Sequence, residues 1–106
     1  MSEVFGGPYK LFKKTLDDYN RPYVAVISIC ILNNNGLSER YYRDGTIQST
    51  VIKKHTSLQK VLDGAIKRLE YLIQQEFYHP VDPLDLTTLQ DLVKLTASTA
   101  TVKPVV

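Results

Sequence analysis

Histidine, cysteine and carboxylate side chains would carry catalysis or hold a metal, and in this chain they are few and scattered. His55 and His79 flank a predicted helix at its opposite ends, so they do not share a metal within one chain. The single cysteine, Cys30, offers no zinc-ligand spacing and lies in an apolar run, where it reads as a small hydrophobe. The adjacent Asp17 and Asp18 suit a turn. We therefore predict no catalytic residue, no metal site and no cofactor, and we favour a protein that is not an enzyme.

Binding chemistry is better represented, because aromatic and cationic side chains fall on neighbouring predicted strands. Aromatic and arginine side chains on an exposed sheet can stack on bases, and nearby cations can contact phosphates. We predict a small nucleic-acid-binding protein that uses single strands of DNA or RNA as its ligand. The predicted binding residues are Tyr41, Arg43, Gln48, Lys10, Lys13, Lys14, Lys53 and Lys54.

The element that must position these residues is the run Tyr23–Leu32, which is β-branched at almost every second residue and has no clearly polar face. Such a strand belongs inside a sheet that is covered on both sides. The chain reads as an α+β fold with a four-stranded antiparallel meander at 9–16, 23–33, 37–43 and 46–54. The first strand is expected at the edge, with its lysines discouraging unwanted pairing, and the segment before it as a flexible lead-in.

The dipeptides Asn35-Gly36 and Asp44-Gly45 both suit two-residue hairpin turns, which require positive φ. With two such turns, Cys30 lies opposite Tyr41, and Tyr41 lies opposite Gln48. One predicted face is a core face made by Ala25, Ile27, Ile29, Ile31, Tyr42, Ile47 and Val51. The other is mixed and holds Val24, Val26, Ser28, Cys30, Leu32, Glu39, Tyr41, Arg43, Gln48 and Thr50.

Two helices follow the predicted sheet. Thr56 and Gln59 form a capping box for a long amphipathic helix over 57–77, whose apolar stripe would cover the Ile-rich face. Gly64 lies in the middle of this helix, as a tolerated surface glycine or as a point of close approach to the sheet or to a second helix. Asp82-Pro83 starts a short helix over 83–96. The tail 97–106 is predicted to be disordered or to add a strand elsewhere.

Composition restricts the class of protein. At 106 residues, with 43% hydrophobic and 23% charged residues, the chain suits one globular domain, which we place at 1–96. A net charge of +2 excludes a strongly basic, histone-like binder. We see no signal peptide and no apolar run of membrane-spanning length, which leads us to expect an intracellular protein, cytoplasmic by default, with no membrane partner.

Two functions from different classes fit this layout. A meander followed by one long helix, over residues 9–77, is similar in layout to the Whirly-type and coactivator-type single-strand binders, which dimerise. The alternative is a protein-interaction or assembly module with no nucleic-acid role, either a homodimer or a viral or accessory protein that binds a host partner. The predicted dimer interface comprises Gly64, Ala65, Val24 and Val26. The C-terminal helix and a second subunit are the two candidates for covering the mixed face.

Overall fold

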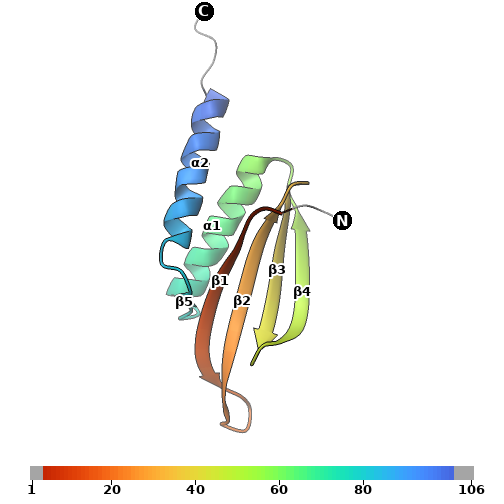
Figure 1. Cartoon of the computed structure of the whole chain (residues 1–106), viewed down its shortest axis with the longest axis vertical. Helices are drawn as coiled ribbons and strands as arrows, with labels where there is room; N and C mark the ends of the chain where they lie inside the picture. Colours follow the sequence, from red (N-terminus) through yellow and green to blue (C-terminus); the bar gives the residue numbers. More distant parts are fainter. Residues whose placement is uncertain (1–3, 102–106) are drawn as a thin grey trace, which may run out of the picture.

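The computed structural model of the chain describes residues 4–101 and confirms the α+β class with an antiparallel sheet. The five strands of the sheet lie in the order β4-β3-β2-β1-β5, and two helices pack on one side of the sheet (Figure 1). The elements in chain order are β1 (Val4–Leu16), β2 (Pro22–Leu32), β3 (Gly36–Arg43), β4 (Thr46–Lys54), α1 (Leu58–Gln74), β5 (His79–Pro80) and α2 (Asp85–Thr101).

Strand β1 begins at Val4, so the flexible lead-in expected before residue 9 is wrong for residues 4–8, and the rest of it lies outside the described residues. The Gly6-Gly7-Pro8 segment pairs irregularly with β2, with two register shifts before Tyr9. Gly7 makes this possible because it adopts φ +100, and a Cβ there would lie 2.7 Å from the carbonyl oxygen of Ile29. A glycine pair therefore acts as a bulge within a strand here, and not as a break before one.

Strand β1 is also not the edge of the sheet. The two-residue strand β5 pairs with it, with His79 opposite Phe12 and Pro80 opposite Leu11. The Val81 amide extends the pairing by donating to the carbonyl oxygen of Lys10 at 2.9 Å. No sequence pattern indicates β5, because two residues that include a proline have neither the length nor the composition typical of a strand.

Helix α1 is capped by Ser57, whose hydroxyl accepts from the Lys60 amide at 3.2 Å, so the predicted capping box led by Thr56 is wrong by one residue. The helix ends at Gln74 and not near residue 77. Helix α2 starts at Asp85, after the Asp82 carboxylate accepts from the Leu84 amide. It continues to Thr101, beyond the predicted end at 96, and the rest of the predicted tail lies outside the described residues.

The core lies between the sheet and α1. Ala25, Ile27, Ile29 and Ile31 of β2 are all buried, as the strand pattern predicts. Helix α1 buries its own stripe against them, composed of Val61, Leu62, Ala65, Leu69 and Leu72. Burying one such aliphatic side chain contributes roughly 1.5–3 kcal/mol, so this contact dominates stability.

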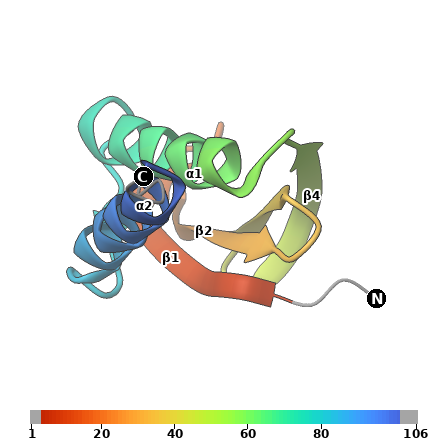
Figure 2. The same ribbon diagram turned by 90° about the horizontal axis from the view of Figure 1, so that it is seen from above.

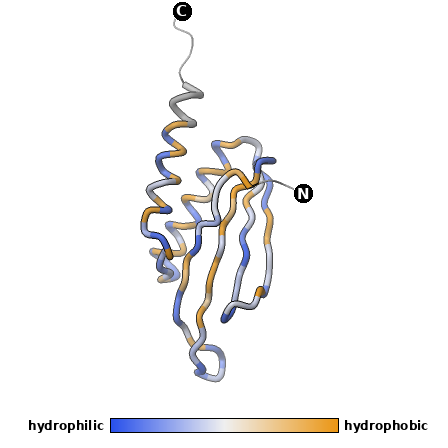
Figure 3. Tube along the Cα trace, in the orientation of Figure 1, coloured by the Kyte–Doolittle hydropathy of each residue, from blue (hydrophilic) through white to orange (hydrophobic). Residues whose placement is uncertain are grey.

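Both helices lie on the same side of the sheet (Figure 2). Helix α2 packs mainly against α1, with Leu89 fully buried. The expectation that the C-terminal helix covers the second face of the sheet is therefore wrong. Strand β2 is apolar along most of its length, whereas its neighbours mix polar and apolar residues (Figure 3). We call the helix side the covered face and the other side the open face.

The two hairpins differ in their turns. Asp44 and Gly45 form the predicted two-residue turn, with φ of 48 and 83 and Arg43 opposite Thr46. The β2–β3 connection instead uses three residues, Asn33–Asn35, with Asn35 at φ 62. Asparagine tolerates this left-handed conformation, and a three-residue loop ending in such a residue is a standard hairpin type.

The longer loop moves the pairing of β3 by three positions from the predicted register. Ile27, and not Cys30, lies opposite Tyr41, and Cys30 lies opposite Ser38. An odd shift exchanges the two faces of a strand. A bulge between Tyr41 and Tyr42 then leaves Tyr41 opposite Ser49 in β4 and not opposite Gln48.

Candidate functional site

The corrected register divides the predicted binding residues between the two faces of the sheet. Tyr41 and Arg43 follow Ile27 and Ala25 onto the covered face, so their placement beside Val24 and Val26 is wrong. On β1, Lys13 also belongs to the covered face, whereas Lys10 and Lys14 belong to the open face. The predicted site is therefore not one continuous surface.

Arg43 is held within the chain by the β1–β2 loop. Its guanidinium forms an ion pair with Asp17 at 3.0 Å and lies over the Tyr23 ring at 4.3 Å. The Asp17 carboxylate also accepts from the Arg21 and Tyr19 amides. These bonds, led by the Arg21 amide, lower the pKa of Asp17 below its usual value. Asp17 thus organises the loop, as the turn interpretation predicts.

Tyr41 and Lys13 also have partners inside the covered face. Burial and a hydrogen bond with Tyr23 raise the pKa of Tyr41 to about 12, so its hydroxyl stays protonated. The ammonium of Lys13 lies 4.6 Å from the centre of the Tyr78 ring. Both side chains help to close the sheet against the segment after α1.

Among the residues that the structure describes, the open face is left without a covering element. On this face, the side chains of residues that pair between neighbouring strands form rows across the sheet. One row holds His79, Phe12, Val26, Tyr42 and Ile47. Neighbouring strands are about 4.8 Å apart, so Phe12 and Tyr42 stand roughly 10 Å apart with Val26 between them. The Phe12 and His79 rings are in contact, with their centroids 5.7 Å apart.

Cations flank this aromatic row on the open face. The next row holds Lys10, Ser28, Arg40 and Thr50. Lys14 lies beside Val24 on the opposite side of the aromatic row. Side chains two residues apart on a strand are separated by roughly 7 Å, so each ring has a cation within one such step.

The charge of the open face has one sign. Within residues 4–101, no Asp or Glu side chain projects from it; Asp44, at the hairpin turn, is engaged by the Val24 amide at 2.9 Å. Burial raises the pKa of the Cys30 thiol, while the charges of Arg40 and Lys10 act in the opposite direction. The pairing register places both cations in the row of Ser28, two residues from Cys30 along β2.

The remaining predicted cations lie at the β4 side. Gln48 is the extra residue of the β4 bulge, and its side-chain amide donates to the Thr46 carbonyl oxygen. Lys54 falls on the open face, beside Gly36, and its ammonium is 3.5 Å from the Asn34 carbonyl oxygen. Lys53 is on the covered face, where it borders a groove between β4 and α1.

The four residues of the predicted dimer interface do not lie on one common surface either. Val24 and Val26 are half-buried on the open face, between β1 and β3. Ala65 is fully buried within the chain and leaves no surface for a partner. Gly64 lies against His55, since a Cβ at Gly64 would be 3.2 Å from the Cε1 atom of that ring. The glycine is thus explained by a close approach to the residue that follows β4.

Sequence reasoning missed three of the residues that form the open face, namely Phe12, Arg40 and Tyr42. The alternation along β1 already placed Phe12 between Lys10 and Lys14. Arg40 and Tyr42 were assigned to the opposite side because the β2–β3 loop was taken as two residues long. The signal that could have found them is the run of three asparagines, each of which suits a loop position.

No helix within residues 4–101 is both long and apolar enough to cross a membrane. The same residues contain no group of three or more His, Cys, Asp or Glu side chains that could hold a metal ion. Comparison of the chain with protein-family models, curated proteins and solved structures found no match. The likeness in layout to the Whirly-type binders therefore stays a prediction.

Proposed function

We propose that this protein binds single-stranded nucleic acid on the open face of its sheet. The observation that carries the proposal is the composition of that face: Phe12 and Tyr42 in one row, Lys10, Lys14 and Arg40 beside them, and no carboxylate among its described residues. Phe12 and Tyr42 are half-buried, so part of each ring is exposed. Aromatic rings stack on bases of any sequence, and the flanking cations neutralise phosphates. Of the binding residues predicted from the sequence, the proposed surface retains Lys10 and Lys14, and it has Tyr42 and Arg40 in place of Tyr41 and Arg43.

The half-buried aliphatic side chains of β2 do not argue against this surface. Val24, Val26 and Leu32 are flanked by β1 and β3, and Ser28 is only 6% exposed. They form the floor between the rings and cations that project from the neighbouring strands. An apolar floor favours stacked bases over a solvated duplex backbone.

The proposal is tested by the anisotropy of a labelled oligothymidine with the full chain at several salt concentrations. Tyr42→Leu removes the ring but keeps apolar bulk; loss of one stacked base, worth roughly 1–3 kcal/mol, should weaken binding about 5- to 150-fold. Arg40→Ala should lower the slope of log affinity against log salt by about 0.7. Lys60→Ala, an exposed cation on α1, is the matched control and should leave the slope unchanged.

Absence of binding by the parent protein at low salt contradicts the proposal. Equal effects of Arg40→Ala and Lys60→Ala also contradict it, since they would indicate attraction to net charge and not to one face.

Self-association through the same face is a second candidate, favoured by a separate observation. Ile47 and Ile52 of β4 are 51% and 57% exposed, and both lie on the open face. Thr50 lies between them on this face. Large aliphatic side chains exposed on one face are typical of a protein interface. The mass of the full chain in solution tests this candidate: a dimer that Ile47→Lys converts to single chains supports it, and a single-chain mass of the parent contradicts it.

A further inference from the structure

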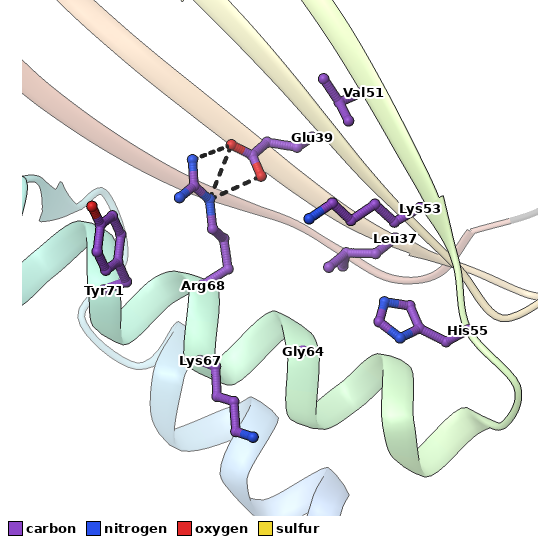
Figure 4. Close-up of a pocket in the computed structure, with 9 residues that line it drawn as sticks. All are labelled: Leu37, Glu39, Val51, Lys53, His55, Gly64, Lys67, Arg68 and Tyr71. Carbon is purple, nitrogen blue, oxygen red and sulfur yellow. Dashed lines mark hydrogen bonds and ion pairs between the residues drawn. The ribbon is translucent and has the colours of Figure 1, made fainter.

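Among the residues that the structure describes, β4 is a free edge of the sheet, and the groove between β4 and α1 runs beside it. All nine residues of β4 are exposed, and only β3 pairs with it. On the covered face, a groove of about 510 Å³ separates this strand from α1 (Figure 4). Val51, Lys53 and His55 border the groove from the strand side, and Gly64, Lys67, Arg68 and Tyr71 from the helix side.

The direction of the free backbone groups follows from the pairing of β4 with β3. The His55 amide donates to the carbonyl oxygen of Asn35 at 2.9 Å, and Lys53 and Val51 lie opposite Leu37 and Glu39. Hydrogen-bonded residues alternate along an antiparallel pair. The intervening residues Thr50, Ile52 and Lys54 therefore direct their amides and carbonyl oxygens to the outside.

The groove has a definite charge. Arg68 binds the Glu39 carboxylate through both of its oxygens, at 2.8 to 3.2 Å, so this pair neutralises itself. Lys53 remains, and it forms no ion pair with a side chain that the structure describes. Lys53 extends along the groove from the strand side, whereas the Lys67 side chain projects from the other side of α1, away from the strands (Figure 4). Leu37 and Val51 supply an apolar floor. The groove thus offers apolar contact and one cation without an acidic partner.

We propose that β4 and this groove bind an extended, acidic peptide segment of a partner protein, which adds to the sheet as a further strand. The backbone of the segment would pair with Thr50, Ile52 and Lys54. Alternate side chains would enter the groove, a carboxylate toward Lys53 and an aliphatic group toward Val51. This site is separate from the open face and does not depend on nucleic-acid binding.

Charge decides between this occupant and a second copy of the chain. In a β4–β4 pair, each groove would receive the Lys53 side chain of the other copy beside its own Lys53. Lysines on an edge strand discourage pairing with an identical edge. They do not discourage an acidic strand, which gains from the same charges.

The probe is an acetylated, amidated and labelled octapeptide that alternates threonine with glutamate and valine, titrated into the full chain. A second peptide has lysine in place of glutamate. Ile52→Pro removes an outward amide without touching the β3 ladder, and proline is tolerated on edge strands. Lys53→Glu reverses the groove charge, and Lys60→Glu, a charge reversal on α1 outside the groove lining, is its control. Circular dichroism checks that each variant is folded.

The proposal requires that the acidic peptide binds and the lysine peptide does not. Binding should weaken at least tenfold in Ile52→Pro and severalfold in Lys53→Glu, and stay unchanged in Lys60→Glu. No binding, or equal binding of the lysine peptide, overturns it. So does displacement of the peptide by oligothymidine together with weaker oligothymidine binding in Lys53→Glu, which would make the groove a nucleic-acid site. A dimer that Ile52→Pro dissociates assigns the edge to a second copy.

Discussion

Gly64 in the middle of α1 allows a quantitative test of how the helix meets the end of β4. Glycine inside a helix costs about 1 kcal/mol relative to alanine, so Gly64→Ala should stabilise an otherwise unhindered helix by that amount. Here the added Cβ would lie 3.2 Å from Cε1 and 3.4 Å from Nε2 of His55. That ring nitrogen is buried and has no hydrogen-bond partner among the described residues, so no bond anchors it.

The ring must shift by a few tenths of an ångström to admit the methyl group, at a cost of about 1 kcal/mol, the lower end for overpacking. We therefore expect Gly64→Ala to change the free energy of unfolding by about zero in the native chain. In the His55→Ala background the obstacle is gone, and the same substitution should raise this free energy by about 1 kcal/mol. The coupling between the two sites is then about 1 kcal/mol, which exceeds the scatter of roughly 0.3–0.5 kcal/mol for independent sites.

Urea unfolding of the four proteins, followed by circular dichroism, gives the double-mutant cycle. Lys60→Ala, made in both backgrounds, is an additive control because its side chain is exposed on the same helix. Equal stabilisation by Gly64→Ala in both backgrounds would refute the close approach of His55. Destabilisation in both backgrounds would instead show that an obstacle other than the ring meets the methyl group.

Two further predictions concern the helix cap and the β1–β2 loop. Ser57→Ala should lower the free energy of unfolding by about 1 kcal/mol because it removes the acceptor for the Lys60 amide, whereas Thr56→Ala should change it by less than about 0.5 kcal/mol; equal effects in urea unfolding would contradict the cap assignment. Asp17→Asn should destabilise the protein at pH 7. Because the folded pKa of Asp17 is lowered, its stabilisation is complete above the unfolded value of about 3.8 and is lost as the pH falls through the folded pKa, so native and variant stabilities should converge in acid. A gap that is the same at pH 7 and pH 2.5 would show that the ionised carboxylate is not the cause.

Local sequence patterns were sufficient to predict the structure where the residues could be stable in only one environment. The alternating aliphatic residues of β2 could only be buried, and the apolar stripe of α1 could only face them. The Asp44-Gly45 turn was predictable because both positions need positive φ and both residues tolerate it. Each of these features is determined by residues that are close together in the sequence. Together they define the fold class and most of the order of the helices and strands.

The site itself could not be read in the same way. Lys10 and Lys14 were correctly placed together, because their spacing along one strand is a local property. Whether Tyr41 or Tyr42 joined them depended on the length of the β2–β3 loop, and Asn33–Asn35 is compatible with more than one hairpin. An odd shift in pairing exchanges the faces, so this one choice decided every β3 side chain.

By itself, then, the chain determined the buried strand Tyr23–Leu32, the helix that covers it and the alternation on β1, since each follows from hydrophobic period and burial. Only the tertiary structure decided which side of β3 faces the helix, that β5 caps β1, and that β4 is the free edge beside a cationic groove. Strand pairing joins residues far apart in sequence through backbone hydrogen bonds that are the same for every residue type. The partner and the register are therefore selected by the packing of the whole sheet.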